Sequence, residues 1–428
     1  MNNMAWRSTQ LGQVCEKPQY GYTASAQRDP IGPKFLRITD LRDGRIDWDS
    51  VPFCEVTDEE LARYRLSHGD ILVARIGATT GSTSIVIDPP NSVFASYLIR
   101  LRANHEAHPF FLYFYTIDAQ FRNWIDAHKD SNLKGGVNVP VLLAAPLALP
   151  TANEQEKIAA ILWKLQRAIA TQDRLIAATR DLKQSAMNHL FSHGLRGESL
   201  QETEIGPMPE SWRVANIDEM ATVSSGGTPS RTDPEYWSGG TIPWVKTGEV
   251  NYCVIEDTEE KITCVGLKNS AAKILPKGTL LLAMYGQGIT RGKVAILGID
   301  AATNQACAAL QLKGKKINVD FLYHTLVAGY ERLRGLAHGG QQQNLNGDLI
   351  RGFTFAMTDD LGEQRDIAAA LTTIDRKLAH HQKKRAALND LFQTLLHKLM
   401  TGEIRVADID IDTSEITASI GAPALKKT

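Results

Sequence analysis

The sequence EQEKIAAIL at residues 154–162 recurs as EQRDIAAAL at residues 363–371, at a constant offset of 209 positions. The offset also holds upstream, where Leu66 corresponds to Leu275 and Gly69 to Gly278. Self-similarity at a fixed offset is the signature of duplicated structural units. We therefore expect a tandem duplication, in which a globular domain followed by a long helix occurs twice.

Each repeated stretch opens a long apolar stripe. In the second copy, the stripe begins with Ile367, Leu371 and Ile374 and keeps a 4-3 spacing to Leu399. This spacing is typical of a coiled-coil seam. The first copy has a matching seam, which consists of Ile158, Leu162, Leu165, Ile169, Gln172, Ile176, Thr179, Lys183, Ala186 and Leu190.

Local signals mark the two ends of each predicted helix. A Thr-x-x-Glu capping box at residues 151–154 begins the first helix, and Asp-x-x-Glu at residues 360–363 begins the second. Gly194 and Gly402 mark the ends. Such a stripe also suits a helix that packs only on its own domain, but two matching helices in one chain favour antiparallel pairing with each other.

The duplication predicts an α+β fold with a pseudo-two-fold tandem repeat. Two mixed, β-rich domains are separated by two long helices that pair as an antiparallel coiled coil. We expect the last segment to be frayed, as chain termini often are. The predicted boundaries are 1–150 for the first domain, 151–197 for the first helix, 208–358 for the second domain, 359–402 for the second helix, and 403–428 for an acidic tail.

The two domains are expected to be mostly β, each with a late helix. Residues 35–48 read as a β-hairpin around the Asp-Gly turn at 43–44. The late helices are predicted over residues 110–128 and 320–333. The other predicted strands are 70–76, 83–87 and 97–102 in the first domain, and 243–250, 279–285, 293–297 and 308–313 in the second.

The composition limits the classes of protein to consider. The 428 residues include 47 Lys and Arg against 48 Asp and Glu, so the formal net charge is −1. This balance excludes a basic protein that coats nucleic acid by charge alone, and also an acidic disordered chain. No apolar run approaches the ~18–20 residues of a membrane helix, and the N-terminus has no apolar signal-peptide core. We expect a cytoplasmic protein that does not contact membranes.

The five cysteines do not predict a metal centre. Cys15, Cys54, Cys253, Cys264 and Cys307 form no Cys-x-x-Cys pair, and no histidine lies at ligand spacing from the closest two. A zinc site needs tighter pairs than these. Reduced thiols are the expected state.

Two segments are similar to catalytic motifs but lack essential residues. The sequence DPPN at residues 88–91 is similar to the adenine-binding motif of amino-methyltransferases, but Asn91 stands where an aromatic residue would stack on the flipped base. Residues 286–293 are similar to a phosphate loop, but Val294 replaces the Ser or Thr that would bind magnesium. We expect both segments to be turns, and we predict neither a catalytic site nor a cofactor.

What remains is a set of polar loops whose side chains suit nucleic acid. Arg and Lys read guanine, and Asn and Gln read adenine, through paired hydrogen bonds in the major groove. Any one of these loops, taken alone, is also compatible with ordinary protein surface. The candidate DNA-binding residues are Arg37, Arg75, Thr79, Thr80, Thr83 and Lys134 in the first domain, and Thr228, Ser230, Arg231, Lys246, Tyr285, Thr290, Arg291, Lys293, Gln341, Gln342 and Asn344 in the second.

Taken together, these features resemble the specificity subunit of type I restriction-modification enzymes over essentially the whole chain. The resemblance rests on the duplicated Glu-Gln-x-x-Ile-Ala-Ala helix start and on short motifs. The first domain departs from the pattern, because it has GPKF at 32–35 and no Gly-Gly-Thr-Pro. This difference is expected if the two domains read different sequences. The motifs are PESW at 209–212, GGTP at 226–229, YW at 236–237, IPW at 242–244, NQ at 304–305 and LMTG at 399–402.

The resemblance implies a non-catalytic DNA-binding protein of host defence. Each domain would be a target recognition domain that reads one half of a bipartite site, while the conserved spacer helices set the spacing. The implied partners are double-stranded DNA, two methyltransferase subunits and the restriction (translocase) subunits. The assembled complex would be a type I site-specific deoxyribonuclease and adenine methyltransferase.

Two other functions remain open on the sequence alone. A self-contained methyltransferase or nuclease would need the missing stacking aromatic and a cofactor-binding loop. A coiled-coil scaffold that recruits proteins would not need polar recognition loops.

Overall fold

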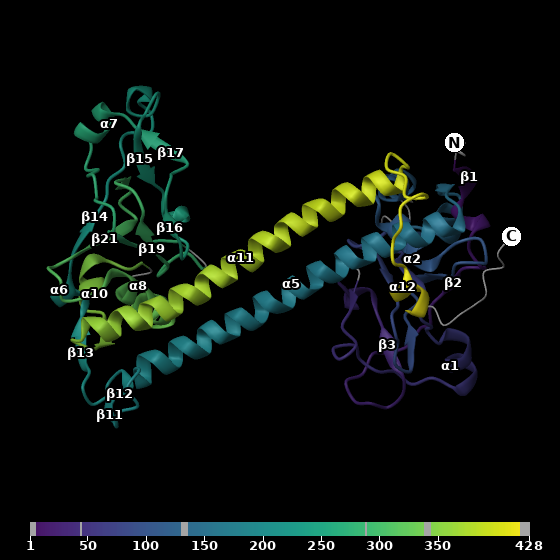
Figure 1. Ribbon diagram of the computed structural model, residues 1–428, viewed down its shortest axis with the longest axis horizontal. Coiled ribbons are helices and arrows are strands. Elements are labelled where there is room, and N and C mark those ends of the chain that lie inside the picture. Colours follow the sequence, from purple (N-terminus) through teal and green to yellow (C-terminus); the bar gives the residue numbers. More distant parts are fainter. Residues whose placement is uncertain (1–5, 43–44, 130–135, 287–288, 338–343, 420–428) are drawn as a thin grey trace. The chain divides into compact units, whose positions relative to one another are not determined.

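The computed structural model describes residues 6–42, 45–129, 136–286, 289–337 and 344–419. Contacts divide the chain into two units: unit 1 contains Met1–Asp173 and Lys383–Thr428, and unit 2 contains Arg174–Gln382. Each unit therefore holds one β-rich domain together with a segment of each long helix (Figure 1). Among the described residues, no helix is long and apolar enough to cross a membrane.

The core of unit 1 is built on an antiparallel sheet with strand order β2-β9-β6-β7. The predicted strands at 70–76, 83–87 and 97–102 are confirmed as β6, β7 and β9. The strands and short helices of unit 1 are β1 (Arg7–Gln10), β2 (Gln19–Tyr20), β3 (Lys34–Leu36), β4 (Leu41–Arg42), β5 (Arg45–Ile46), α1 (Asp58–Tyr64), β6 (Ile71–Ala74), β7 (Thr83–Ile85), β8 (Ser92–Phe94), β9 (Leu98–Leu101), α2 (Pro109–Ile117), α3 (Ala119–His128), α4 (Val139–Leu143), β10 (Pro146–Leu149) and α12 (Ser414–Ser419).

The predicted hairpin at 35–48 is only partly correct. Strands β4 and β5 do pair antiparallel, with Leu41 opposite Ile46. The apolar residues of β3, however, do not belong to this hairpin. They pair in parallel with β8, so that Phe35 lies opposite Val93. The sequence pattern shows that a strand is present, but its partner lies almost 60 residues away along the chain.

The helix predicted over 110–128 is divided into α2 and α3. Asp118 separates them with an extended backbone, and its carboxylate accepts a hydrogen bond from the Gln120 amide at 2.9 Å. This is an N-cap, which begins a new helix. The apolar run of α2, with Phe110 and Phe114 fully buried, packs into the core of unit 1.

Unit 2 repeats this architecture with additional strands. A five-stranded sheet of order β14-β21-β18-β19-β16 lies beside a three-stranded sheet of order β17-β15-β20. The strands and short helices are β11 (Leu200–Thr203), β12 (Gly206–Pro209), β13 (Arg213–Asn216), α6 (Ile217–Met220), β14 (Ala221–Ser225), β15 (Ile242–Val245), β16 (Val254–Ile255), β17 (Glu260–Ile262), α7 (Cys264–Lys268), β18 (Leu280–Ala283), β19 (Val294–Leu297), β20 (Ala302–Thr303), β21 (Cys307–Leu312), α8 (Val319–Ala328), α9 (Tyr330–Gly335), α10 (Gly347–Arg351) and β22 (Thr354–Met357).

The predicted strands of unit 2 are confirmed as β15, β18, β19 and β21, although β15, β18 and β19 are shorter than expected. The helix predicted over 320–333 is divided at Gly329 into α8 and α9. Phe353 packs directly against this glycine, because a Cβ added there would lie 2.7 Å from its ring. The division therefore depends on a residue that is distant in sequence.

The two predicted long helices are confirmed as α5 (Ala152–His193) and α11 (Leu361–Met400) (Figure 1). Gly194 and Gly402 follow them in the left-handed conformation, with φ of 62° and 75°. This is the expected glycine at the end of a helix.

Segments of α5 and α11 run antiparallel within each unit. In unit 1, the Arg385 side chain on α11 pairs with Asp173 on α5, with Nε 3.0 Å from Oδ1. In unit 2, Lys183 on α5 pairs with Asp375 on α11 at 2.6 Å. The coiled coil along the whole length of both helices stays a prediction.

The capping boxes are only half formed, because both glutamates have other partners. In unit 1, the fully buried Glu154 accepts hydrogen bonds from the Trp6 indole at 3.0 Å, from Arg405 Nε at 2.7 Å and from the Val406 amide at 3.3 Å. Burial raises the pKa of Glu154, but these hydrogen bonds outweigh it and hold the pKa below its ordinary value. The segment that follows α11 is thus bound to the first turn of α5.

The same junction occurs in unit 2. The Glu363 carboxylate accepts hydrogen bonds from the Leu195 amide at 3.0 Å and from the Trp212 indole at 3.3 Å, and Arg196 lies 3.8 Å away. Here the segment that follows α5 is bound to the first turn of α11. The glutamate of the repeated motif therefore connects the beginning of one long helix to the segment after the other.

The glutamine of the motif binds the domain that precedes each helix. Gln155 accepts from the His108 amide at 2.8 Å and donates to the Pro150 carbonyl at 3.0 Å. Gln364 accepts from the Asn318 amide at 2.7 Å and donates to the Thr358 carbonyl at 2.8 Å. Since both residues are buried, these bonds explain why Glu-Gln recurs in both copies.

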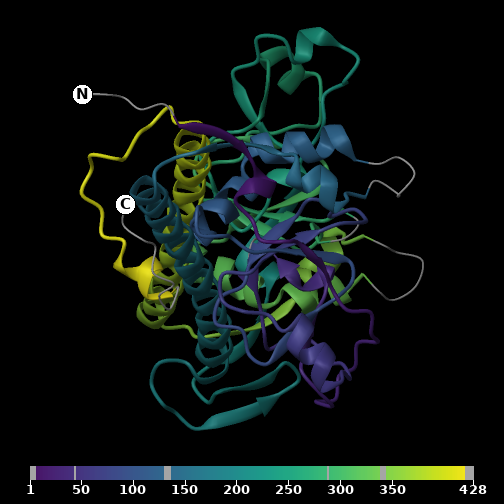
Figure 2. The ribbon, with the colours of Figure 1, turned by 90° about the vertical axis from the view of Figure 1, so that its right-hand side faces the viewer.

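The acidic tail, which was expected to be frayed, is docked on unit 1. Val406 and Ile416 are buried in its core, and Lys157 on α5 donates to the Ala407 carbonyl at 2.7 Å. The last element of its described part is α12, drawn in yellow in Figure 2. Its isoleucine and valine side chains are the apolar signal that the prediction overlooked.

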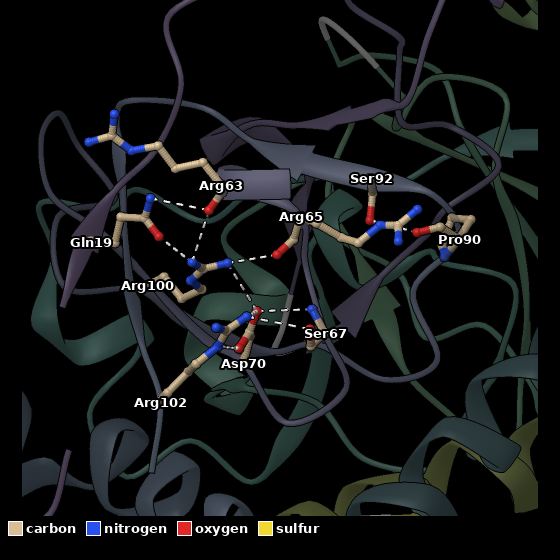
Figure 3. Close-up of polar contacts among 9 residues, drawn as sticks. All are labelled: Gln19, Arg63, Arg65, Ser67, Asp70, Pro90, Ser92, Arg100 and Arg102. Atoms are coloured by element: carbon tan, nitrogen blue, oxygen red, sulfur yellow. Dashed lines mark hydrogen bonds and ion pairs between the residues drawn. The ribbon is translucent and has the colours of Figure 1, made fainter. Parts of the chain in front are cut away.

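A buried ion cluster fixes strand β9 in unit 1 (Figure 3). Asp70, only 1% exposed, binds Arg102 through its Oδ1 at 2.5 Å and Arg100 through its Oδ2 at 3.6 Å. Arg100 also donates to the Arg65 carbonyl at 2.7 Å. The cluster joins β9 to the segment that follows α1.

Candidate nucleic-acid interface

In unit 1, three segments meet at the turn between β8 and β9, which we call central turn 1 (residues 94–97). The Tyr22 amide donates to the Phe94 carbonyl at 2.7 Å, and the Ala95 amide donates to the Leu36 carbonyl at 2.8 Å. The Arg75 amide donates to the Tyr97 carbonyl at 3.0 Å. The loops that contain Arg37 and Arg75 therefore lie beside one another.

The turn between β20 and β21, central turn 2 (residues 303–306), has the same role in unit 2. The Gly227 amide donates to the Thr303 carbonyl at 2.9 Å, and the Met284 amide donates to the Ala306 carbonyl at 2.8 Å. The Asn304 amide donates to the Val245 carbonyl at 3.3 Å. The candidates Thr228, Lys246 and Tyr285 each directly follow a residue in these contacts.

In each unit, a backbone hydrogen bond joins a fourth loop to the loop that follows β6 or β18. The Val137 amide donates to the Arg75 carbonyl at 2.8 Å in unit 1, and the Leu345 amide donates to the Met284 carbonyl at 3.1 Å in unit 2. Asn344 is thereby placed beside the Tyr285 loop. The two units thus assemble four corresponding segments around corresponding turns.

Glycines allow the first loop of each unit to approach its central turn. A Cβ at Gly21 would lie 2.2 Å from the Ala95 carbonyl oxygen, and a Cβ at Gly226 would lie 2.0 Å from that of Thr303. No other residue fits such an approach without a backbone shift. The Gly-Gly of the GGTP motif is therefore required by close packing.

Central turn 1 is surrounded by arginine and tyrosine. The Arg75 guanidinium lies over the Tyr20 ring, 4.8 Å from its centroid. Tyr20 and Tyr97 are 40% and 53% exposed. Arg37 is bound to Asp40 at 2.9 Å, and this hydrogen bond raises the pKa of its guanidinium. An arginine stacked on an aromatic ring is held ready for a planar partner such as a base.

Central turn 2 is surrounded by hydroxyls and amides. The Thr228 hydroxyl donates to Gln305 Oε1, and the Thr247 hydroxyl donates to Asn304 Oδ1 at 3.0 Å. Tyr285 is 44% exposed beside them. Hydroxyl and amide groups have the donors and acceptors that hydrogen bonds with base edges require.

Two predicted basic residues of unit 2 are engaged with acidic partners. Arg231 pairs with Glu260, and its guanidinium lies 3.9 Å from the centroid of the Trp237 ring. Lys246 pairs with Glu259 at 2.6 Å and with Glu260 at 3.3 Å, and the hydrogen bond to Glu259 raises its pKa. Neighbouring glutamates therefore balance the positive charges of these two side chains, in keeping with the net charge of −1 for the whole chain.

The other candidates of unit 2 lie on neighbouring elements. The Ser230 carbonyl accepts from the Trp237 indole at 2.9 Å. Lys293 donates to Asn251 at 2.8 Å. Thr290 and Arg291, both half-buried, follow one another in the loop between β18 and β19.

The threonines of unit 1 differ in their surroundings. Thr79 and Thr80 line a groove that also includes Arg122 and Asn389. Thr83 is only 7% exposed in β7, and its hydroxyl donates to the Thr116 carbonyl at 3.3 Å. Thr83 was expected to contact DNA, but burial makes its side chain unavailable. Lys134, Gln341 and Gln342 lie outside the described residues.

Sequence reasoning missed Gln305 and Tyr97 as candidate contacts. Both belong to the central turns, and both are exposed. The Asn-Gln pair at 304–305 is visible in the sequence, but its position between two strands does not indicate which loops surround it. The internal alignment could have found Tyr97, because central turns 1 and 2 correspond at the constant offset.

In their described residues, the segments rejected as catalytic motifs form bends and turns, as expected. Asp88 has a φ of 41°, and its carboxylate contacts His68 at 2.9 Å. Gly286 has a φ of 131° after β18. All five cysteines are free thiols, and burial raises the pKa of Cys15 to about 12. Across the described ranges, no group of three His, Cys, Asp or Glu could hold a metal ion.

The chain is similar to known proteins over nearly its whole length. Residues 3–178 and 209–390 match the family described as type I restriction modification DNA specificity domain. The chain is 23% identical over 410 residues to the putative type I restriction enzyme MjaX specificity subunit of Methanocaldococcus jannaschii, with 94% of each protein covered. It is also 23% identical over 392 residues to the type I restriction enzyme MjaVIII specificity subunit of that organism, covering 88% of this chain and 87% of the relative.

Solved structures show the same fold. The S subunit of a type I restriction-modification system from M. genitalium superposes with a TM-score of 0.65 at 17% identity, covering 94% of this chain and 97% of the other. A second structure, described as the structural basis of complex assembly and conformational transition of the type I R-M system, gives a TM-score of 0.53 at 18% identity, covering 94% and 99%.

Proposed function

This chain belongs to the type I restriction-modification DNA specificity family, and we propose that it recognises a bipartite DNA sequence, with one half-site read by each unit. One observation carries the proposal: the same four segments surround a central turn in both units. A duplicated arrangement of exposed polar and aromatic groups suits two separate contacts with one DNA duplex, as in dimeric readers whose half-sites are about one helical turn apart.

The side chains of the two units favour different bases. Unit 1 presents Arg75 stacked on Tyr20, and arginine pairs with guanine. Unit 2 presents the amides of Asn304 and Gln305 with the Thr228 hydroxyl, and amides pair with adenine. Two different half-site sequences follow from this difference.

The long helices carry two equivalent faces that suit a protein partner. AATRDLKQ at 177–184 on α5 matches AALNDLFQ at 386–393 on α11, and the identical positions are exposed in both copies. They include Leu182 and Leu391, which are 53% and 45% exposed. Single exposed leucines need no explanation, but the same exposed leucine among the same exposed identical positions in both copies favours a common partner.

We infer that these faces dock two copies of the methyltransferase subunit, one in each unit. The partner would supply the catalysis and some of the backbone contacts with DNA, so that the chain itself is neither a methyltransferase nor a nuclease. The restriction subunits would join through this complex. The MjaX and MjaVIII relatives are named as specificity subunits of restriction enzymes, which supports the same division of labour.

Methylome sequencing tests the proposal. Cells that carry the complete locus should show a bipartite motif with methylated adenine, and deletion of this gene alone should abolish the motif. Complementation should restore it, and the purified chain without partners should not transfer methyl groups. A motif that persists after the deletion, or methylation by the chain alone, would contradict the proposed function.

A further inference from the structure

We propose that Gln305 is a base-reading residue of unit 2 and that it recognises the major-groove edge of an adenine. This inference rests on the proposed function and deepens it, because it assigns one base contact to one side chain. Three observations support it: a rigid turn, an oriented amide and a close approach permitted by glycine.

The turn that carries Gln305 is rigid. Thr303 before it and Cys307 after it are fully buried in strands β20 and β21. The Asn304 carboxamide oxygen accepts from the Ala306 amide at 3.1 Å and from the Thr247 hydroxyl at 3.0 Å. Gln305 is exposed between these fixed neighbours. The backbone therefore presents this side chain from a fixed position.

The amide of Gln305 is oriented by Thr228. The Thr228 hydroxyl donates to Gln305 Oε1, which leaves that oxygen one further lone pair. Among the contacts of the described residues, the amide nitrogen of Gln305 donates no hydrogen bond to protein. One acceptor site and an NH₂ group thus remain available side by side. Adenine offers the complementary pair, an N6 amino donor and the N7 acceptor.

The Gly-Gly pair at 226–227 brings Thr228 to this position. Their loop approaches the turn so closely that a Cβ at Gly226 would collide with the Thr303 carbonyl. The Trp244 indole donates to the Gly227 carbonyl at 3.0 Å and fixes the loop from its other side. Thr228 is thus a positioning residue, which acts on DNA through Gln305.

Unit 1 has different chemistry at the same place. The internal alignment puts Ser96 of central turn 1 where unit 2 has Gln305. Arg75 donates weakly to the Ser96 carbonyl, with Nη1 3.5 Å from the oxygen. The side chain at this position differs between the two copies, whereas the backbone hydrogen bonds around it correspond. Such a position suits a residue that distinguishes one half-site from the other.

The test uses the deletion strain complemented with variants of the full chain, read by methylome sequencing. Gln305→Ala should relax one A·T position in one half-site, with a loss of discrimination on the order of ten- to a hundredfold. Gln305→Glu should move the preference at that position towards cytosine, because a carboxylate accepts from the cytosine amino group. The other half-site should be unchanged in both variants, and it serves as the internal control.

The role of Thr228 has its own variants. Thr228→Val should weaken discrimination at the same position as Gln305→Ala, and Thr228→Ser should retain it because the hydroxyl is kept. Gln120→Ala is the matched control, since this exposed glutamine lies on α3 of unit 1, outside the central turns and the proposed docking faces.

Three outcomes would overturn the inference. They are an unchanged motif in Gln305→Ala, an unchanged motif that is methylated less at every site, and loss of all methylation in both Gln305 variants. The second would indicate a phosphate contact, and the third a structural role. Failure of the proposed function is distinguishable, because the parent chain would then confer no bipartite motif at all.

Discussion

At the scale of single residues, buried polar groups connect the long helices to the domains. His324 on α8 is 1% exposed, and its Nε2 lies 3.0 Å from the Thr372 hydroxyl on α11. Its Nδ1 is 3.9 Å from Asp375, which is paired with Lys183. Burial, with a smaller effect of Lys183, lowers the pKa of His324 to about 3.

This pKa predicts how the stability of the protein changes with pH. An unfolded histidine titrates near 6.5, so below that pH the unfolded chain binds a proton that folded His324 excludes. Stability is therefore fully present above about pH 6.5 and falls as the pH drops towards 3. We expect His324→Gln to be less stable than the parent protein at pH 7.5. As the pH falls, however, its free energy of unfolding should decrease less steeply than that of the parent, and near pH 5 the two slopes should differ by about 1 kcal/mol per pH unit.

Denaturant unfolding at several pH values between 7.5 and 5 measures this difference. His105→Gln is the control, because His105 is exposed and its replacement should leave the slope of the parent protein. Parallel stability curves for His324→Gln and the parent would show that His324 is not excluded from protonation in the folded state.

At the scale of elements, the loop at 226–231 depends on its glycines. Gly226→Ala should force the loop away from the Thr303 carbonyl and separate Thr228 from Gln305. The expected result is degraded recognition of one half-site, together with a modest loss of stability of about 1–3 kcal/mol from overpacking. Methylome sequencing and thermal unfolding of the same variant measure the two effects.

Gly248→Ala is a suitable control for this substitution. No heavy atom lies within 4 Å of a Cβ added at Gly248, and its φ is not in the left-handed region. It should leave both the motif and the unfolding temperature nearly unchanged. If Gly226→Ala behaved in the same way, close packing of the loop would not matter for recognition.

The elements also show what the sequence could predict. The long helices and strands β6, β9, β18 and β21 were predictable, because their apolar patterns are long and local signals mark the helix ends. The breaks at Asp118 and Gly329 were not, because apolar residues continue through both and the deciding contacts are a cap and a distant ring.

The candidate site was predictable only as separate loops. Composition identifies polar segments, whereas their meeting at a central turn depends on backbone hydrogen bonds between residues 22 to 76 positions apart. For this reason Gln305 was missed and the buried Thr83 was included. The side chain of Thr83 belongs to a strand that the prediction placed correctly, but every residue of that strand is buried, and Thr83 contacts α2.

At the scale of the whole molecule, we expect the length of the long helices to set the distance between the two half-sites. In unit 2, Lys183 faces Asp375, so the antiparallel register places Ile176 opposite Gln382. Insertion of one heptad after Ile176 and one after His381 preserves this register and leaves both proposed docking faces intact. Seven residues add about 10 Å of helix, which corresponds to ~3 base pairs of DNA. The gap in the methylated motif should lengthen accordingly, with both half-site sequences retained.

Insertion of four residues at the same two positions is the matched control. It breaks the 4-3 phase of the seam, so pairing and methylation should both be impaired. A heptad variant with an unchanged gap would mean that the helices dock partners without setting the distance. Altered half-site sequences would mean that the two units do not read DNA independently.

Unit 1 consists of two separate stretches of the chain, and this affects how the protein folds during synthesis. Its core contains Phe392, Leu396 and Val406, which a ribosome delivers more than 200 residues after Leu162 of the same core. Unit 2 is one continuous segment and can finish folding first, which reverses the N-terminal-first order usual in multidomain synthesis. Any product that terminates before these residues leaves the apolar surface of unit 1 uncovered. Incomplete chains therefore expose apolar surface of the kind that chaperones and proteases recognise.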